Sequence, residues 1–163
     1  MFREMRRNRQ MLPMEETLEL LKKGTSGVLA LLGDEDYPYA VPVSYVYADE
    51  KLYFHGARSG HKLDAIRKQD KASFCVISQD RIMPEEYTTY FRSVIAFGRI
   101  RILEDEAEMR RAIEILAEKY SPDVSEAGRR QEIDKTWNAL CMLEFTIEHV
   151  TGKEAIELAR GRK

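Results

Sequence analysis

Residues 53–62 read YFHGARSGHK and carry the chain from a strand through a glycine turn to the start of a helix. The strand-forming run 52–54 stops at a histidine and a glycine, and a second glycine precedes the amphipathic segment 61–69. A turn of this kind exposes backbone N–H groups, and the dipole of the following helix favours negative charge. Arg58 and Lys62 add two cations. The stretch therefore predicts a site for a phosphate group. The alternative is a glycine-rich connection without a ligand.

The size and composition of the chain indicate one domain that can bury a core. It has 163 residues, of which 44% are hydrophobic and 33% are charged. The net charge of −2 gives no reason to expect a nucleic-acid partner, because proteins that read phosphate backbones carry a basic excess or stripe. No apolar run approaches the length of a membrane span, so we expect no membrane partner.

The cysteines and the N-terminal segment favour a cytoplasmic protein. Several arginines make residues 1–13 a basic tail, which we expect to be solvated or to contact a partner; a nucleic-acid or membrane role is the alternative. No hydrophobic signal region follows these arginines, so export is not expected. Cys75 and Cys141 lie in apolar strand-like runs without a CxxC pair, which predicts buried free thiols in a reducing compartment.

Apolar periodicity and turn residues predict the secondary structure. Pro42 lies inside a predicted strand and cannot donate to a ladder, which indicates an edge, a bulge or a backbone that faces a ligand. Gly98 in the middle of another strand indicates a bulge or bend. The polar segment 79–90 is predicted to be a loop. Helices are predicted at 14–23, 61–69, 104–120 and 126–137, and strands at 27–32, 39–47, 51–55, 72–78, 92–103 and 140–150.

These elements predict a mostly β fold with flanking helices (α+β). Short turns between neighbouring strands favour antiparallel pairing. Long strands with few helices between them indicate a small antiparallel barrel with helices packed outside. We expect one domain at residues 14–155, between the basic tail at 1–13 and a C-terminal tail at 156–163.

Several common site signatures do not fit the sequence. The turn at 56–62 is one residue short of a Walker A loop, and Leu63 stands where that loop needs Ser or Thr. Neither a GxGxxG helix start nor a GxSxG elbow occurs. His55, His61 and His149 have no His, Cys or carboxylate at a metal-binding helical spacing, so we expect no metal site.

Three parts of the chain, in this order and spacing, resemble a known family. The first is YPYAVPVSYVY at 37–47 with KLYFHGARSGHKLDAI at 51–66, the second YFRSVIAFGRIRIL at 90–103, and the third EHVTGKEA at 148–155. They resemble the FMN-binding split β-barrel proteins related to pyridoxamine 5′-phosphate oxidase. Within that family the chain is most similar to the nitroimidazole-resistance branch. The resemblance spans roughly residues 14–155.

The resemblance implies a homodimer that binds two FMN molecules in clefts at the subunit interface. The strand at 40–45 would run along the flavin and meet its edge through backbone groups, a role that suits a strand interrupted by proline. The pair His61-Lys62 would meet the phosphate, with a histidine where the family oxidase has arginine. The implied cofactor-binding residues are Val41, Pro42, Val43, Ser44, Tyr45, His55, Gly56, Ala57, Arg58, His61, Lys62 and Ser93.

The resemblance also implies an activity. His55 matches a histidine of the nitroimidazole-reductase branch that lies close to the flavin, where it would donate a proton or a hydrogen bond to a substrate oxygen. A packed histidine that only fixes the strand end is the alternative. The implied function is an FMN-dependent oxidoreductase that reduces nitro-aromatic or similar small electrophilic molecules.

Two other functions stay open. The first is a flavin-binding module without turnover, acting as a store, carrier or sensor. The second is oxidation of pyridoxamine 5′-phosphate, although the chain ends ELARGRK at 157–163 without the C-terminal Arg/His signature of the authentic oxidase.

Overall fold

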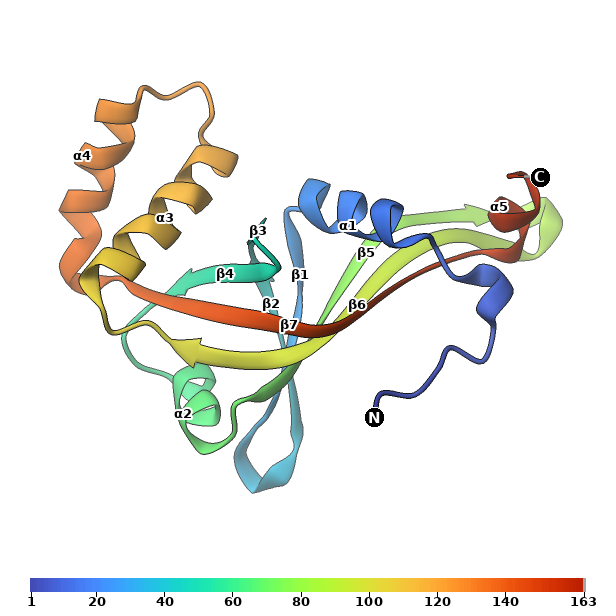
Figure 1. Ribbon diagram of the computed structural model, residues 1–163, viewed down its shortest axis with the longest axis horizontal. Helices are drawn as coiled ribbons and strands as arrows, with labels where there is room; N and C mark the ends of the chain where they lie inside the picture. The colour runs from blue at the N-terminus through green and yellow to red at the C-terminus, as the bar shows by residue number, and fades with distance from the viewer. Residues whose placement is uncertain (163) are drawn as a thin grey trace.

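The computed structural model describes residues 1–162 and contains one antiparallel sheet with helices around it (Figure 1). The strand order is β2-β1-β5-β6-β7-β4-β3. The strands are β1 (Ser26–Leu32), β2 (Pro38–Ser44), β3 (Val46–Ala48), β4 (Lys51–Gly56), β5 (Lys71–Met83), β6 (Thr88–Ile102) and β7 (Cys141–Glu154). The helices are α1 (Met14–Lys23), α2 (His61–Lys68), α3 (Glu106–Tyr120), α4 (Glu126–Thr136) and α5 (Ile156–Arg160).

The two outermost strands of the sheet are consecutive in the chain. β2 ends at Ser44 and β3 starts at Val46, so a single residue, Tyr45, connects the two edge strands of the sheet. The predicted single strand at 39–47 is therefore wrong. The Tyr45 side chain is fully buried, its hydroxyl donates to the Leu21 carbonyl at 2.5 Å, and its N–H donates to the Thr25 carbonyl at 3.4 Å. The antiparallel prediction is confirmed, but no ladder joins β2 to β4 within residues 1–162, so the barrel does not close.

Alternation along β4 divides the interior into two cores. Leu52 and Phe54 face a cluster inside the curved sheet, and Tyr53 faces a second cluster beneath α3 and α4. Burying each such large apolar side chain contributes about 1.5–3 kcal/mol. The second cluster includes Met109 and Leu116 of α3, so these helices are packed onto the outer face of β4 and β7. The predicted helices at 104–120 and 126–137 are confirmed, each shorter by one or two residues.

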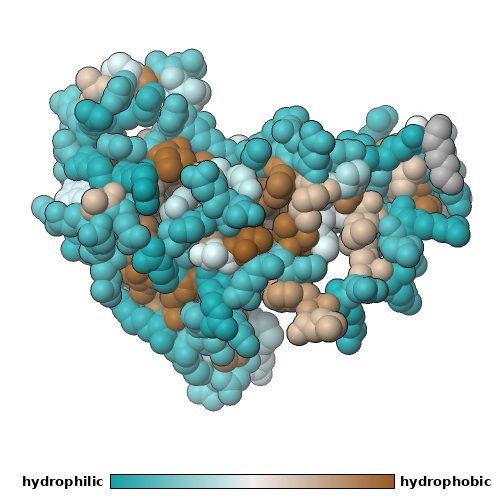
Figure 2. Space-filling model, viewed as in Figure 1, coloured by the Kyte–Doolittle hydropathy of each residue, from teal (hydrophilic) through white to brown (hydrophobic). Residues whose placement is uncertain are grey.

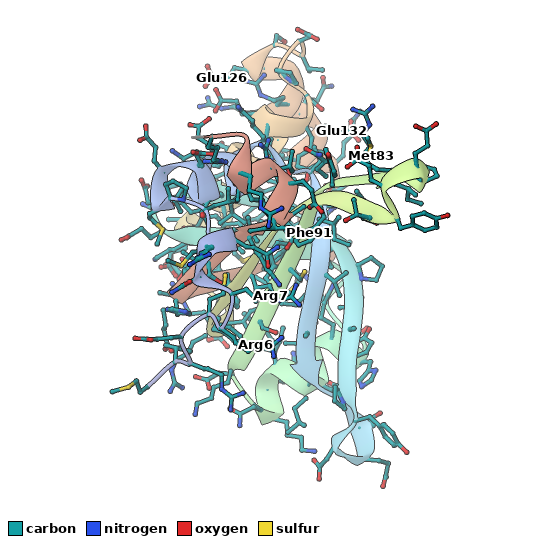
Figure 3. All side chains as sticks on the ribbon, turned by 90° about the vertical axis from the view of Figure 1, so that its right-hand side faces the viewer. Arg6, Arg7, Met83, Phe91, Glu126 and Glu132 are labelled. Carbon is teal, nitrogen blue, oxygen red and sulfur yellow. The ribbon has the colours of Figure 1, made fainter. Side chains whose placement is uncertain are left out.

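The β5–β6 hairpin extends beyond its neighbours and forms a projecting arm at the opposite end of the sheet from α3 and α4 (Figure 1). Met83 and Phe91 mark its two strands in Figure 3. The loop predicted at 79–90 is therefore wrong except at its tip, the 3₁₀ turn Pro84–Glu86. The arm has no core on either face, so its strands lack the polar–apolar alternation that would reveal them.

The bulge predicted at Gly98 is confirmed. The β6–β7 register shifts between Phe97 and Gly98, and a Cβ on Gly98 would lie 2.0 Å from the Thr146 carbonyl oxygen. Only glycine lets the two backbones approach this closely.

Packing extends past both ends of the predicted domain. Leu12 is buried, and Met11 bridges to Lys153. The Glu154 carboxylate, which is 2% exposed, is held by Arg92 at 3.2 Å and by Arg162 at 2.7 Å. Arg162 also pairs with Glu16 of α1, which ties the segment after β7 to the first helix.

Cys75 and Cys141 are free thiols, as predicted, but only Cys141 is buried; Cys75 is half-buried on the outer face of β5. Within residues 1–162 no helix is long and apolar enough to cross a membrane.

Candidate functional site

The divergence of β2 and β4 opens a fork in the sheet. β3 pairs with β4 as far as Val46 and Tyr53. Beyond this pair, β4 continues along β7, whereas the chain that precedes β3 belongs to β2 and leaves β4; we call the region between β2 and β4 the fork. β2 turns to pair with β1, as in Ser44 with Ser26, while His55 pairs with Met142 of β7 on its other side. The facing edges of β2 and β4 therefore carry backbone N–H and C=O groups that no ladder uses in the described chain. Such edges can hydrogen-bond a ligand.

Pro42 lies on the outer strand β2, so the predicted edge position is confirmed. Pro42 and Ser44 are exposed on the outside of the sheet, while Val41 and Val43 pack against the inner core. Tyr45 also belongs to that core. Of the predicted stretch 41–45, only the Tyr45 side chain is fully buried and thus closed to a cofactor.

A clamp from the end of α3 holds the fork at Tyr45. The Tyr120 hydroxyl accepts the Tyr45 N–H at 3.0 Å and lies 2.8 Å from the Tyr45 carbonyl and close to that of Thr25. The Lys119 ammonium donates to the Tyr45 carbonyl at 3.2 Å and to that of Gly24. Its Nζ also lies 4.5 Å from the centre of the Tyr45 ring, a cation–π distance. Burial lowers the pKa of Lys119.

The turn after β4 gathers positive charge. Gly60 has a φ of +130°, a conformation that suits glycine, and α2 begins at the next residue. The Lys62 Nζ lies 3.4 Å from where a Cβ on Gly56 would stand, so Lys62 folds back over the strand end. Burial raises the pKa of the nearby Cys141 thiol, while the charges of Arg67, Lys62 and Arg58 oppose that rise. Three cations around one strand end fit an anionic group.

The Arg58 guanidinium also makes hydrogen bonds to backbone carbonyls of the protein. Its Nε donates to the Leu140 carbonyl at 3.2 Å and an Nη donates to that of Trp137 at 3.3 Å. The guanidinium thus connects the β4–α2 turn to the segment after α4.

His61 is joined to the β1–β2 hairpin. Its ring stacks on Tyr39, with centroids 4.0 Å apart, and its Nε2 accepts the Asp34 N–H at 3.2 Å. The Asp34 carboxylate lies 3.8 Å away. Because Nε2 is engaged and a carboxylate is close, a phosphate would meet His61 only through Nδ1. The phosphate role of His61 stays a prediction.

A cavity of about 700 Å³ lies between the end of β4 and helices α3 and α4. His55, Gly56 and Ala57 form one side, and the opposite walls include Leu116, Ala117 and Ile133. Small-molecule sites typically measure roughly 300–1,000 Å³. The predicted site residues His55, Gly56 and Ala57 line this cavity, whereas no residue of its helical wall was among the predicted ones.

His55 is an exposed polar residue of the cavity lining, on the same face of β4 as Tyr53. Partial burial and the nearby Lys62 charge lower its pKa below the ordinary value of 6.5. The ring is therefore neutral at pH 7 and can both donate and accept a hydrogen bond. It lines the cavity together with Gly56 and Ala57; its cofactor-binding and catalytic roles stay predictions.

Ser93 is far from His55 along the sheet of the same chain. It pairs with Lys153, whereas His55 pairs with Met142, eleven residues earlier on β7. At about 3.3 Å per residue this is roughly 35 Å of strand. No cluster of His, Cys, Asp and Glu in the described residues could hold a metal ion.

A family model described as pyridoxamine 5′-phosphate oxidase matches residues 13–154. The chain belongs to this family. Membership confirms the resemblance drawn from the three sequence segments. No curated protein sequence matches the chain significantly.

Solved structures share the fold. A candidate 5-nitroimidazole antibiotic resistance protein from Bacteroides thetaiotaomicron is 18% identical, with a TM-score of 0.72, over 88% of this chain and 86% of that one. An FAD-binding protein from Mesorhizobium loti is 24% identical, with a TM-score of 0.60, over 90% and 97%. An FAD- and heme-binding protein from Mycobacterium smegmatis is 22% identical, with a TM-score of 0.71, over 90% and 73%.

Proposed function

We propose that the chain binds a flavin nucleotide at the fork between β2 and β4, with its phosphate beside Lys62. The observation that carries this proposal is the meeting of unused backbone edges with a cationic strand end. The family assignment supports it, as do the flavin-binding proteins among the similar structures. We propose FMN as the nucleotide; the FAD-binding proteins make FAD the alternative to test.

The proposed activity is the reduction of nitro-aromatic or similar small electrophilic molecules. A bound flavin supplies the two-electron chemistry. The chain supplies the other groups: the β2 and β4 edges orient the ring, Lys62 binds the phosphate, and His55 offers a hydrogen bond or proton to the substrate oxygen. Because its pKa is lowered, His55 donates from the neutral ring at pH 7.

We propose that a second copy completes the site. Ser93 lies on β6, which β1 and β5 separate from β2 in the sheet, so in this proposal it contributes to the fork of a partner chain. The outer faces of β1, β5 and β6 form an apolar surface for that contact: Val28, Cys75 and Ile95 are in register, and Phe97 is 40% exposed. Exposed apolar surface of this kind favours association.

The test begins with the absorption spectrum of the purified protein and with chromatography of the released cofactor against FMN and FAD standards. The flavin is then reduced anaerobically and mixed with a 5-nitroimidazole. We expect faster reoxidation in the wild type than in His55→Ala, with His149→Ala as the control. Absence of flavin after reconstitution contradicts the cofactor proposal. Equal rates contradict the role of His55 and favour a flavin-binding module without turnover.

Two further measurements address the remaining alternatives. Formation of pyridoxal phosphate in air tests pyridoxamine 5′-phosphate oxidation, and we expect none. Sedimentation of the flavin-loaded protein tests the dimer; a tightly loaded monomer contradicts a shared cleft.

A further inference from the structure

The arginine-rich segment before α1 is packed on β7. Residues Asn8–Gln10 form a 3₁₀ turn, in which the Gln10 N–H donates to the Arg7 carbonyl at 3.0 Å. The Gln10 side chain fixes this turn to the end of β7, because its Nε2 donates to the Glu154 carbonyl at 3.0 Å. On the face shown in Figure 2, the surface in this region, to the right, is mostly hydrophilic. Side chains that start from a fixed backbone lose less freedom when they bind a ligand.

A hollow of about 340 Å³ lies between this segment and the start of α5. Arg6 and Arg7 lie side by side in the segment (Figure 3). Among residues 1–162 neither they nor Arg9 has an ion-pair partner or a side-chain hydrogen bond, and no carboxylate lines the hollow. The lining consists of Arg6, Arg7, Asn8, Arg9, Gln10 and Ile156.

The carboxylates around the hollow do not neutralise these arginines. Glu154 and Glu16 both pair with Arg162. Of the acidic residues close in sequence, Glu4 and Glu157 are not among the lining residues. Three guanidinium groups therefore give the hollow a positive charge that an anion would balance.

Gln10 carries a hydrogen-bond acceptor that no group of residues 1–162 satisfies. Gln10 is 4% exposed, and its Oε1 is buried without a donor. The amide cannot be reversed, because a flip would place Oε1 against the Glu154 carbonyl, which is also an acceptor. Buried acceptors in folded proteins are almost always paired, so this one indicates a donor from outside the chain. Since Gln10 lines the hollow, a bound ligand can supply that donor once a long, exposed arginine side chain moves aside.

We propose that the hollow binds a small phosphorylated molecule of the nucleoside diphosphate class. Guanidinium groups pair with phosphate oxygens through two parallel hydrogen bonds, which suits a cluster of arginines. A ribose hydroxyl supplies the donor for Gln10 Oε1, and the base covers the apolar side chain of Ile156. The flavin phosphate is proposed to lie beside Lys62, so this second site does not rest on the proposed function.

The test is titration calorimetry of the flavin-reconstituted protein with ADP, adenosine and pyrophosphate at low ionic strength. We expect ADP to bind at least about tenfold more tightly than adenosine, which lacks the phosphates, a difference of about 1.4 kcal/mol. Pyrophosphate lacks the hydroxyls and should bind at least about threefold more weakly than ADP. Arg7→Gln should weaken ADP binding about fivefold or more. Arg3→Gln makes the same change at an exposed position of the segment, outside the lining, and should leave the affinity within about twofold.

The proposal has clear contrary outcomes. Equal ADP affinities in Arg7→Gln and Arg3→Gln, both shown by thermal melting to be folded, overturn the site. Pyrophosphate binding as tight as ADP binding overturns the choice of a nucleoside. If phosphatidylserine vesicles or a single-stranded oligonucleotide bind through Arg7 and ADP does not, the small-molecule assignment is wrong.

Lys62→Ala separates this site from the proposed flavin site. It should weaken flavin binding and leave ADP binding unchanged. Loss of ADP binding in this variant means that ADP occupies the strand end near Lys62 and overturns the second site. ADP binding through Arg7 in a protein that takes up no flavin supports the second site and contradicts only the cofactor proposal.

Discussion

Replacing Tyr120 by Phe tests whether the clamp from α3 holds the fork. The hydroxyl accepts one hydrogen bond, from the Tyr45 N–H at 3.0 Å. It has one proton to give, so it donates to only one of the two nearby carbonyls, those of Tyr45 and Thr25. The variant therefore loses two hydrogen bonds. At about 0.5–1.5 kcal/mol each, the expected loss is about 1–3 kcal/mol of unfolding free energy.

The surroundings of Tyr120 favour a loss of unfolding free energy in the lower part of this range. Tyr120 is 38% exposed, so water can replace part of what is lost. Lys119 still donates to the Tyr45 carbonyl, which keeps that acceptor satisfied. The ring is retained, so no cavity forms. We expect about 1–2 kcal/mol by urea unfolding, with the slope unchanged.

Tyr87→Phe is the matched control, because Tyr87 is 97% exposed at the tip of the arm. We expect it to be neutral within about 0.5 kcal/mol. If both variants have the same stability, the clamp does not hold Tyr45 and the reasoning about the fork is refuted. If only Tyr120→Phe is destabilised, its flavin affinity should also fall, since the β2 and β4 edges would no longer be fixed.

Three other predictions follow from single residues. Lys62→Ala should weaken flavin binding by about 1–3 kcal/mol in a fluorescence titration, the range for losing a charge-assisted hydrogen bond, while Lys68→Ala on the same helix should not. The NMR titration midpoint of His55 should lie below 6.5 and rise in Lys62→Met, which removes a neighbouring cation. Because that pKa is lowered on folding, the unfolded chain takes up the proton first, and His55 should cost stability as pH falls through 6.5. Gly98→Ala should destabilise the protein by at least about 1–3 kcal/mol in urea, because its Cβ would meet the Thr146 carbonyl.

Each of these predictions has a result that contradicts it. Unchanged affinity in Lys62→Ala places the phosphate elsewhere. A His55 midpoint above 6.5 means that burial and the lysine charge do not govern the ring. A neutral Gly98→Ala variant shows that the bulge can open without cost.

The sequence predicted elements whose signals are local. Pro42 indicated an edge, a bulge or a backbone that faces a ligand, and Gly98 inside a long strand indicated a bulge or bend; both follow from what one residue can or cannot do in a ladder. The arm at 79–90 was missed because neither of its faces packs on a core. The break at Tyr45 was missed because the contacts of this buried residue, such as its hydrogen bond to Leu21 two dozen residues away, leave no local pattern in the sequence.

The candidate site also has one part that could be recognised from the sequence and one part that could not. The cationic turn at 56–62 is contiguous in sequence and could be recognised there. The helical wall of the cavity comes from residues such as Leu116 and Ile133, about sixty residues or more beyond His55. Their apolar spacing predicts a helix face, but that face both packs on the second core and lines the cavity. Periodicity cannot separate these two uses.

The ion pairs around Glu154 bear on how the protein should be produced. A shortened version stopping at residue 155, where the sequence placed the domain end, would retain this nearly inaccessible carboxylate but delete Arg162. Arg92 alone would then have to neutralise it, and Glu16 would lose its counter-ion as well. A buried charge that lacks part of its counter-ions lowers the stability of the folded protein. Expression plasmids should accordingly extend past the last helix to include Arg162, and an affinity tag that follows it should be joined through a flexible spacer.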